Sequence, residues 1–145
     1  MFKHLLVPTD GSPLSNDAAR SAVDFAKAIG ARITTLSVAE PYPYTAVADS
    51  GVLPEQESFD EEMLEQARRH VAEVERFASA AGVPCETQVA LSEHPFEEII
   101  ATAEKLGCDL ILMASHGRKG LSRLFVGSQT QKVLGHTTLP VLVYR

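Results

Sequence analysis

The sequence predicts an α/β protein with an open, five-stranded parallel sheet of strand order 3-2-1-4-5 and helices on both faces. Short apolar segments alternate with amphipathic helical segments along the whole chain, a pattern typical of parallel strands joined by right-handed crossovers. The apolar runs 5–7 and 110–113 are the most continuous, which favours the first and fourth strands for the centre of the sheet. No repeat or linker divides the 145 residues, so we expect one domain over residues 1–145.

The first part of the chain carries clear start and stop signals. Residues 3–8 are expected to form the first strand. Ser12 followed by Pro13 marks a helix start, with the serine as N-cap and the proline at the first helical position, and Gly30 ends this helix. Residues 32–38, which are rich in β-branched side chains, predict the second strand.

The rest of the chain continues the alternation after one irregular segment, 40–58. Its prolines and glycine indicate a long loop, which we interpret either as a partial lid or as a variable surface connection. A long helix over 59–81 is predicted from one apolar stripe: Leu64, Ala67, Val71, Val74, Ala78 and Ala81. The remaining expected elements are an edge strand at 85–91, a helix at 96–106, a strand at 110–113, a helix at 129–135 with Ser128 as its N-cap candidate, and a last strand at 140–144.

Composition excludes several classes of function. The net charge of −6 at pH 7 argues against general nucleic-acid binding. No apolar run approaches the roughly 20 residues that span a bilayer, and Pro8 and Asp10 interrupt the N-terminal apolar run too early for a signal peptide. We therefore expect a cytoplasmic protein without membrane contact. Cys85 and Cys108 have no metal-ligand spacing, so buried or partly buried free thiols are expected rather than a disulfide.

Unusual chemistry is concentrated in the loops after the two central strands. These loops read Pro8-Thr9-Asp10-Gly11-Ser12 and Ala114-Ser115-His116-Gly117. Arg118, Lys119 and Arg123, three of the thirteen Lys and Arg residues, follow within six positions of one another. Open parallel sheets bind ligands beyond the carboxyl ends of their strands, where the strand order reverses. The sequence therefore predicts a cleft with a carboxylate on one side and a glycine-rich basic loop on the other.

A nucleotide suits this polarity. Asp10 can accept hydrogen bonds from an adenine amino group or a ribose hydroxyl, while Gly117, Gly127 and Ser128 can receive phosphates beside a helix N-terminus. Structural interpretations stay open: Asp10 can terminate its strand or cap a turn, the Gly–Ser pair can be a simple helix cap, and His116 can pack against its own backbone instead of a phosphate.

The last strand, 140–144, is apolar on both faces although the expected order leaves it at an edge of the sheet. Such an edge is poorly protected against pairing with another chain. We expect it to pair with a second copy across a two-fold axis, which makes the protein a homodimer. The alternative is a chain end that simply frays.

These segments resemble the universal stress protein family over the whole chain. The resemblance is carried by Leu6-Val7-Pro8-Thr9-Asp10-Gly11-Ser12, by Asp109-Leu110-Ile111-Leu112-Met113-Ala114-Ser115-His116-Gly117 and by Leu139-Pro140-Val141-Leu142-Val143. The ATP-binding branch of that family carries Gly-x2-Gly-x9-Gly-Ser/Thr, and Gly117 with Gly127-Ser128 matches its last three elements. Ala114 replaces the first glycine; alanine permits close backbone approach but not a positive φ.

The resemblance implies a Rossmann-like fold and a homodimer that binds ATP, with Mg²⁺ or Mn²⁺, and acts on an unidentified protein partner in stress responses. AMP or cyclic AMP is an alternative ligand. The implied nucleotide-binding residues are Pro8, Thr9 and Asp10 on the nucleoside side, Val38 near the adenine, Met113 and Ala114 under the ribose, and Gly117, Gly127, Ser128, Gln129 and Thr130 near the phosphates, with His116 and Arg118 beside them.

No catalytic constellation stands out in the sequence. The motif G-x-x-x-x-G-K-[ST] is absent, and G-x-G-x-x-G does not follow the first strand. Asp10 alone does not supply the metal clamp and nucleophile that phosphoryl transfer needs. The leading hypothesis is a nucleotide-dependent regulatory module. The alternatives are a dimeric stress protein that acts by protein–protein contacts without nucleotide, which Ala114 favours, and a slow ATPase or phosphotransferase.

Overall fold

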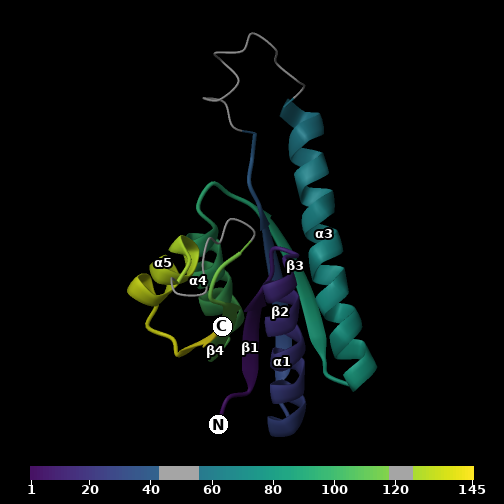
Figure 1. Ribbon diagram of the computed structural model, residues 1–145, viewed down its shortest axis with the longest axis vertical. Helices are drawn as coiled ribbons and strands as arrows, with labels where there is room; N and C mark the ends of the chain where they lie inside the picture. Colours follow the sequence, from purple (N-terminus) through teal and green to yellow (C-terminus); the bar gives the residue numbers. More distant parts are fainter. Residues whose placement is uncertain (43–55, 118–125) are drawn as a thin grey trace.

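The computed structural model describes residues 1–42, 56–117 and 126–145. The elements follow in the order β1 (His4–Pro8), α1 (Pro13–Ile29), β2 (Arg32–Ala39), α3 (Gln56–Ala81), β3 (Cys85–Leu91), α4 (Pro95–Leu106), β4 (Leu110–Ala114), α5 (Ser128–His136) and β5 (Val141–Tyr144). The strands form one parallel sheet of order β3-β2-β1-β4-β5 (Figure 1). The predicted α/β fold and strand order are therefore confirmed.

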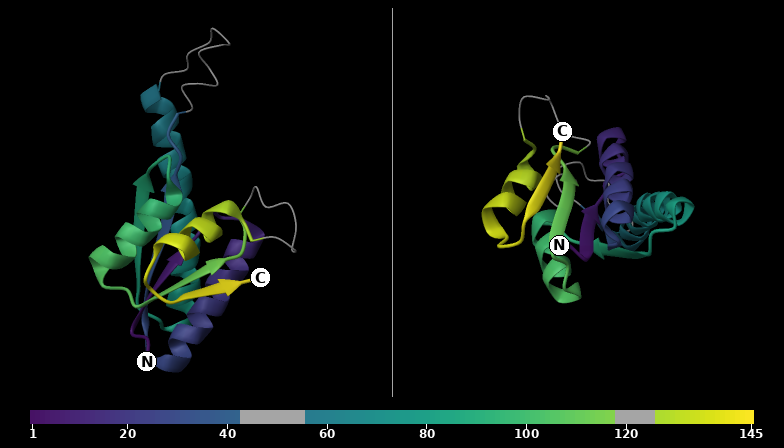
Figure 2. Two further views of the ribbon diagram at one scale, coloured as in Figure 1. Left: turned by 90° about the vertical axis from the view of Figure 1, so that its left-hand side faces the viewer. Right: turned by 90° about the horizontal axis from the view of Figure 1, so that it is seen from below.

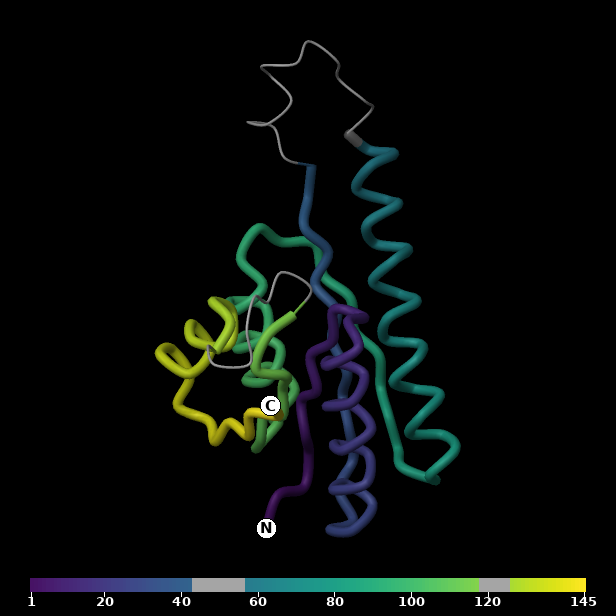
Figure 3. Tube along the Cα trace, in the orientation of Figure 1, coloured from purple at the N-terminus to yellow at the C-terminus, as the bar shows by residue number. Residues whose placement is uncertain are grey.

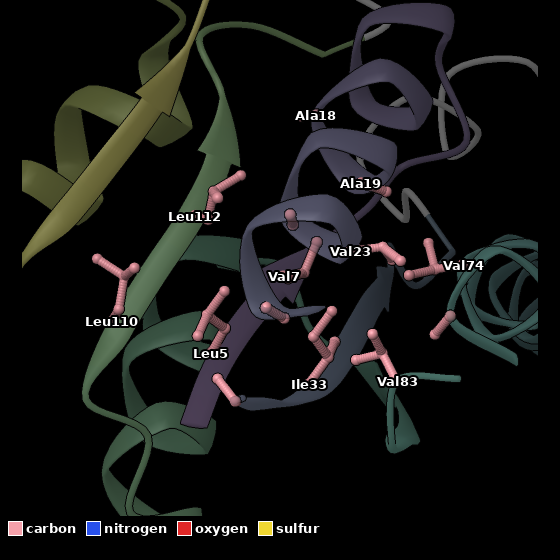
Figure 4. Packing of buried hydrophobic residues seen from close by; sticks show 14 of the residues in the cluster. Leu5, Val7, Ala18, Ala19, Val23, Ile33, Val74, Val83, Leu110 and Leu112 are labelled. Atoms are coloured by element: carbon pink, nitrogen blue, oxygen red, sulfur yellow. The ribbon is translucent and has the colours of Figure 1, made fainter. Parts of the chain in front are cut away.

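Two hydrophobic cores lie on opposite faces of this sheet, because successive side chains of a strand point to opposite sides. Leu5 and Val7 pack with Ile33 against α1 and α3, and four alanines let α1 approach the sheet closely (Figure 4). Leu6 lies in the other core with residues of α4 and α5. Helices α1 and α3 thus cover one face and α4 and α5 the other, as Figure 2 shows.

The boundaries of α1 agree with the prediction. Ser12 is its N-cap, and the serine side chain accepts a hydrogen bond from the Ser15 N–H at 3.2 Å. Pro13 occupies the first helical position, and Gly30 ends the helix in the left-handed region at φ 72°. This helix is positioned from both ends by signals that the sequence states directly.

Several other boundaries differ from the prediction. Helix α3 begins at Gln56, three residues earlier than expected, and residues 43–55 of the expected loop lie outside the described part of the chain. Strand β5 begins at Val141 because Pro140 has no N–H to donate, although its carbonyl still accepts from Ile111 at 3.0 Å. The N-cap of α5 is Gly127, with φ −61° and ψ 157°, so the prediction of Ser128 was wrong.

Helix α3 is the longest element, and its N-terminal turns extend beyond the sheet (Figure 3). The chain leaving β2 is fastened to these turns: the Tyr42 N–H donates to Asp60 Oδ1 at 2.9 Å, and the Tyr42 ring meets Phe59 edge-on at 5.2 Å. No helix in the described ranges is long and apolar enough to cross a membrane. Cys85 is half-buried and Cys108 buried; both are free thiols, as predicted, and burial raises the pKa of each to about 11.

Candidate functional site

The loops that follow β1 and β4 lie side by side. The two strands are parallel neighbours, with Leu5 paired to Leu110 and Leu6 to Ile111, so both chains leave the sheet at the same edge. A Cβ atom added to Gly117 would overlap the Asp10 carboxylate, whose Cγ would lie 3.2 Å away. The carboxylate and the glycine therefore meet at the point where the strand order reverses, as the sequence predicted.

The loop after β1 is held in one conformation by its own short polar side chains. Thr9 is buried; its Oγ1 accepts from the Ser15 hydroxyl at 2.8 Å and from the Gly11 N–H at 3.2 Å. Asp10 Oδ1 accepts from the Ser12 N–H at 3.0 Å, which is an Asx turn. Gly11 has φ +75°, a conformation that side chains disfavour. One oxygen of Asp10 thus caps the turn, which is the structural role left open by the sequence, and the other faces Gly117.

The second motif glycine fits tightly beside the end of β4. The Gly127 N–H donates to the Ser115 carbonyl at 2.6 Å. A Cβ on Gly127 would lie 3.1 Å from His116 Cα and 3.2 Å from the Ser115 carbonyl oxygen, so a larger residue would displace main chain. This contact brings the N-terminus of α5 against the β4 loop. Among the described residues no side chain caps the helix there, and the first N–H groups of a helix have no intrahelical acceptor.

Two predicted phosphate ligands use their side chains elsewhere. The Thr130 hydroxyl is buried and donates to the Ala114 carbonyl at 3.0 Å. Gln129 Oε1 accepts from the Phe96 N–H at 3.0 Å, and it thereby caps the first turn of α4, which has no side-chain cap of its own at His94. The side chains of these two α5 residues are therefore engaged in hydrogen bonds within the protein.

The other predicted site residues are distributed as follows. Met113 and Ala114 are buried at the end of β4, and Val38 is half-buried against the core that contains Leu6. Pro8 is half-buried at the end of β1. His116 is half-buried, with Nδ1 3.1 Å from the Ser115 hydroxyl, so it packs against the neighbouring side chain of its own loop. Arg118 lies outside the described residues.

A histidine that the sequence analysis did not assign reaches the site from α3. The His70 ring lies under Gly11, where a Cβ would overlap it, and His70 Nδ1 is 3.3 Å from the Ser37 hydroxyl. The sequence contains one signal for this position: His70 is three residues after Ala67 and four before Val74, both of them buried core residues of α3. It is therefore a polar residue beside a helix stripe that faces the protein interior.

Two further hollows lie on other parts of the described surface. One, of about 360 Å³, runs along α3 and is lined by Glu61, Glu62 and Glu65 together with Arg69, so its net negative charge repels a phosphate. The other, of about 300 Å³, is lined by Lys3, Lys27 and Arg32 at the opposite edge of the sheet. The C-terminal ends of α1 and α3 lie there, and their partial negative charge offsets part of the positive charge of these three side chains.

The described ranges contain no cluster of three His, Cys, Asp or Glu residues that could hold a metal ion by itself. Magnesium seldom needs such a cluster, since it commonly binds through one or two carboxylates together with waters and substrate phosphates. The described residues therefore fit a cation that arrives with a phosphate ligand better than a resident metal.

Comparison with known proteins gives a match over the whole chain. A profile described as the universal stress protein family covers residues 1–145. A universal stress protein of Thermus aquaticus is 36% identical over 147 residues, with complete coverage of both chains. Universal stress protein MJ0531 of Methanocaldococcus jannaschii is 32% identical over 145 residues, covering all of this chain and 83% of the relative.

Solved structures repeat the fold. The structure of MJ0577 from Methanocaldococcus jannaschii superposes with a TM-score of 0.81 at 26% identity, covering 99% of this chain and 96% of that one. A universal stress protein in complex with cAMP gives a TM-score of 0.72 at 20% identity, covering 99% and 97% of the two chains. One from Archaeoglobus fulgidus in complex with dAMP gives 0.71 at 14% identity, covering 100% and 98%. At these last two identities the likeness concerns the fold alone.

Proposed function

Because the chain belongs to the universal stress protein family, we propose that it binds an adenine nucleotide, ATP with Mg²⁺ or Mn²⁺, in the cleft between the β1 and β4 loops. The protein acts as a homodimeric regulatory module in stress responses, and the bound nucleotide changes the surface that it offers to a protein partner. The observation that carries this proposal is the contact of Asp10 with Gly117 beside the N-terminus of α5.

The polarity of the cleft supports a nucleotide in one orientation. The carboxylate of Asp10 repels phosphates and accepts hydrogen bonds from sugar hydroxyls or an amino group. The N-terminus of α5 attracts anions through the N–H groups of its first turn and the positive end of the helix dipole. The nucleoside therefore lies at the β1 loop, and the phosphates lie at Gly127, Ser128 and the main-chain amides that follow.

Two structural relatives support the ligand class, because one was solved with cAMP and another with dAMP. Both ligands are adenine nucleotides. The phosphate count differs between them and ATP, so the test below includes AMP and cyclic AMP as competitors. The role of Mg²⁺ or Mn²⁺ would be to neutralise phosphate charge, with phosphate oxygens and waters as most of its ligands.

Ala114, the residue that departs from the family motif, does not oppose binding. It ends β4 within the core between the sheet and α1. No described residue other than glycine has a positive φ, so alanine is unstrained at this position. This weakens the one argument for a stress protein that works without nucleotide.

The proposal is tested by isothermal titration calorimetry of the purified protein with Mg-ATP, AMP and cyclic AMP. Any nucleotide that co-purifies with the protein is released by denaturation and measured by its adenine absorbance. We expect saturable binding that Gly127→Ala weakens. Gly135→Ala is the matched control, because Gly135 lies in the same helix and a Cβ there meets nothing within 4 Å. Absence of heat with all three nucleotides, together with absence of co-purified adenine, would contradict the proposal.

A slow ATPase is the second candidate function, and the same purified protein answers it. Phosphate release that is unaffected by Asp10→Ala would argue against hydrolysis at this cleft. A rate that falls with that substitution, and that needs Mg²⁺ or Mn²⁺, would support it.

A further inference from the structure

Helix α3 supports the loop that follows β1, residues 9–12, through the side chain of His70. The His70 ring occupies the space that any side chain at Gly11 would need. A Cβ added to Gly11 would overlap Cδ2, which belongs to the ring edge that carries Nε2. Nδ1, on the other side of the ring, is hydrogen-bonded to the Ser37 hydroxyl at 3.3 Å. Ser37 is 2% exposed and lies near the end of β2, so the ring is tied to the sheet as well as to α3.

The supported loop also contacts the loop that follows β4. Gly11 is held at φ +75° above the ring. Asp10, the preceding residue, forms the Asx turn with Ser12 and lies against Gly117. A continuous path of contacts therefore runs from His70 through Gly11 and Asp10 to Gly117. This path connects α3 with the loops that follow β1 and β4.

We propose that His70 is a positioning residue for the nucleotide site. Its ring holds the 9–12 loop in the position from which the Asp10 carboxylate reaches the nucleoside. This inference rests on the proposed function. His70 does not touch the nucleotide. Its effect passes through Asp10, so it governs affinity for the sugar and base and leaves affinity for the phosphates unchanged.

Ordinary core packing would give a different result. A residue that only fills space stabilises the whole domain, and its removal weakens all ligands of the site to a similar degree. A positioning residue acts on the group that it aims. The two roles are separated by comparing ATP with inorganic triphosphate, which lacks the nucleoside that Asp10 would bind.

The experiment measures binding of both ligands to wild type, His70→Ala, Asp10→Ala and the double variant by calorimetry. We expect His70→Ala to weaken ATP about tenfold, within the range seen for residues that modulate a site indirectly, and to leave triphosphate unchanged. The double variant should bind ATP as Asp10→Ala does, because His70 acts through Asp10. His70→Phe keeps a ring under Gly11 and should restore most of the affinity. His94→Ala, an exposed histidine at the start of α4, is the control.

Equal weakening of ATP and triphosphate, or additive effects of the two substitutions, would overturn the positioning role. Amide NMR spectra of the ligand-free protein give an answer that does not depend on nucleotide. Signals of Gly11 and Gly117 should both move in His70→Ala, whereas the Gly117 signal should stay near its wild-type position in His70→Phe and in His94→Ala. If wild type binds no nucleotide while both glycine signals move, the proposed function fails and the coupling stands; if Gly117 stays fixed, the coupling fails whatever the protein binds. Should His70→Ala not fold, His70→Asn, which can still bond the Ser37 hydroxyl but lacks the ring edge under Gly11, carries both measurements.

Discussion

The carboxylate of Asp10 lies against the main chain of Gly117, at the meeting point of two loops far apart in the sequence. Gly117→Ala would force the carboxylate away, because the new Cβ overlaps it. The carboxylate ends a flexible side chain, so we expect a loss of stability below about 1 kcal/mol but a clear loss of ATP affinity. In the Asp10→Ala background the same substitution should have no effect on ATP binding. Calorimetry on the four proteins of this double-mutant cycle measures the coupling, and additive losses would contradict it.

Gly127 and Gly135 of the α5 segment should respond in opposite directions to alanine. At Gly127 the new Cβ presses on the main chain of His116 and Ser115, so we expect unfolding free energy to fall by about 1–2 kcal/mol. At Gly135 the added Cβ meets no atom within 4 Å, and better helix propensity should raise it by about 0.5–1 kcal/mol. Urea denaturation measures both, and equal effects would rule out the tight contact at Gly127.

The edge strand β5 should mediate dimer formation. Leu142 lies on this strand and is 40% exposed, while Leu134 on α5 is 47% exposed and serves as the matched control. We expect the wild type and Leu134→Glu to sediment as dimers, and Leu142→Glu to sediment as a monomer because a charge enters the paired edge. A monomeric wild type, or a dimer that survives Leu142→Glu, would argue against this interface.

His4 should make stability depend on pH near neutrality. Burial lowers the pKa of His4, and the nearby Arg32 cation adds to this effect against the opposing charges of Glu86 and Asp109. The unfolded chain therefore takes up a proton near its ordinary pKa of about 6.5 while the folded chain does not. Unfolding free energy should fall as the pH drops below that value, by at most about 1.4 kcal/mol per pH unit. Urea titrations from pH 5.5 to 7.5 should give a shallower slope for His4→Gln than for wild type or His94→Gln.

Asp109 holds the start of β1 through hydrogen bonds, and its contribution to the unfolding free energy should change at lower pH than that of His4. Partial burial works against its ionised form, but hydrogen bonds from the N–H groups of Lys3 at 2.8 Å and His4 at 3.0 Å outweigh burial and lower the pKa of Asp109. Its stabilisation is complete above the ordinary pKa of 3.8 and disappears as the pH falls toward the folded pKa. Asp109→Ala should cost about 1–3 kcal/mol at pH 7. The difference from wild type should shrink between pH 5 and 3, and a constant difference would contradict this explanation.

The strand order and most helix bounds could be predicted because they depend on local patterns. The apolar run at β4 and the Ser12–Pro13 start of α1 are fixed by residues next to them in sequence. Among the boundaries that differ from the prediction, the N-cap of α5 has a clear physical reason. Ser128 is the better N-cap by side chain, yet tertiary packing sets the cap at Gly127, where only a glycine fits beside His116.

The candidate site could be predicted only in part. The meeting of Asp10 with Gly117 follows from parallel neighbouring strands, so topology alone gave it. The partners of Gln129 and Thr130 lie on α4 and β4, and the ring of His70 reaches the site from α3. Such contacts depend on how helices sit across the sheet, which hydrophobic periodicity does not specify.

The amide oxygen of Gln129 has one further consequence. It completes the first turn of α4, although its own main chain belongs to the first turn of α5. A ligand that draws α5 toward itself would remove this acceptor from the Phe96 N–H of α4. The exposed beginning of α4 would then loosen. A protein that contacts the beginning of α4 would then distinguish the ligand-bound from the ligand-free state without touching the nucleotide.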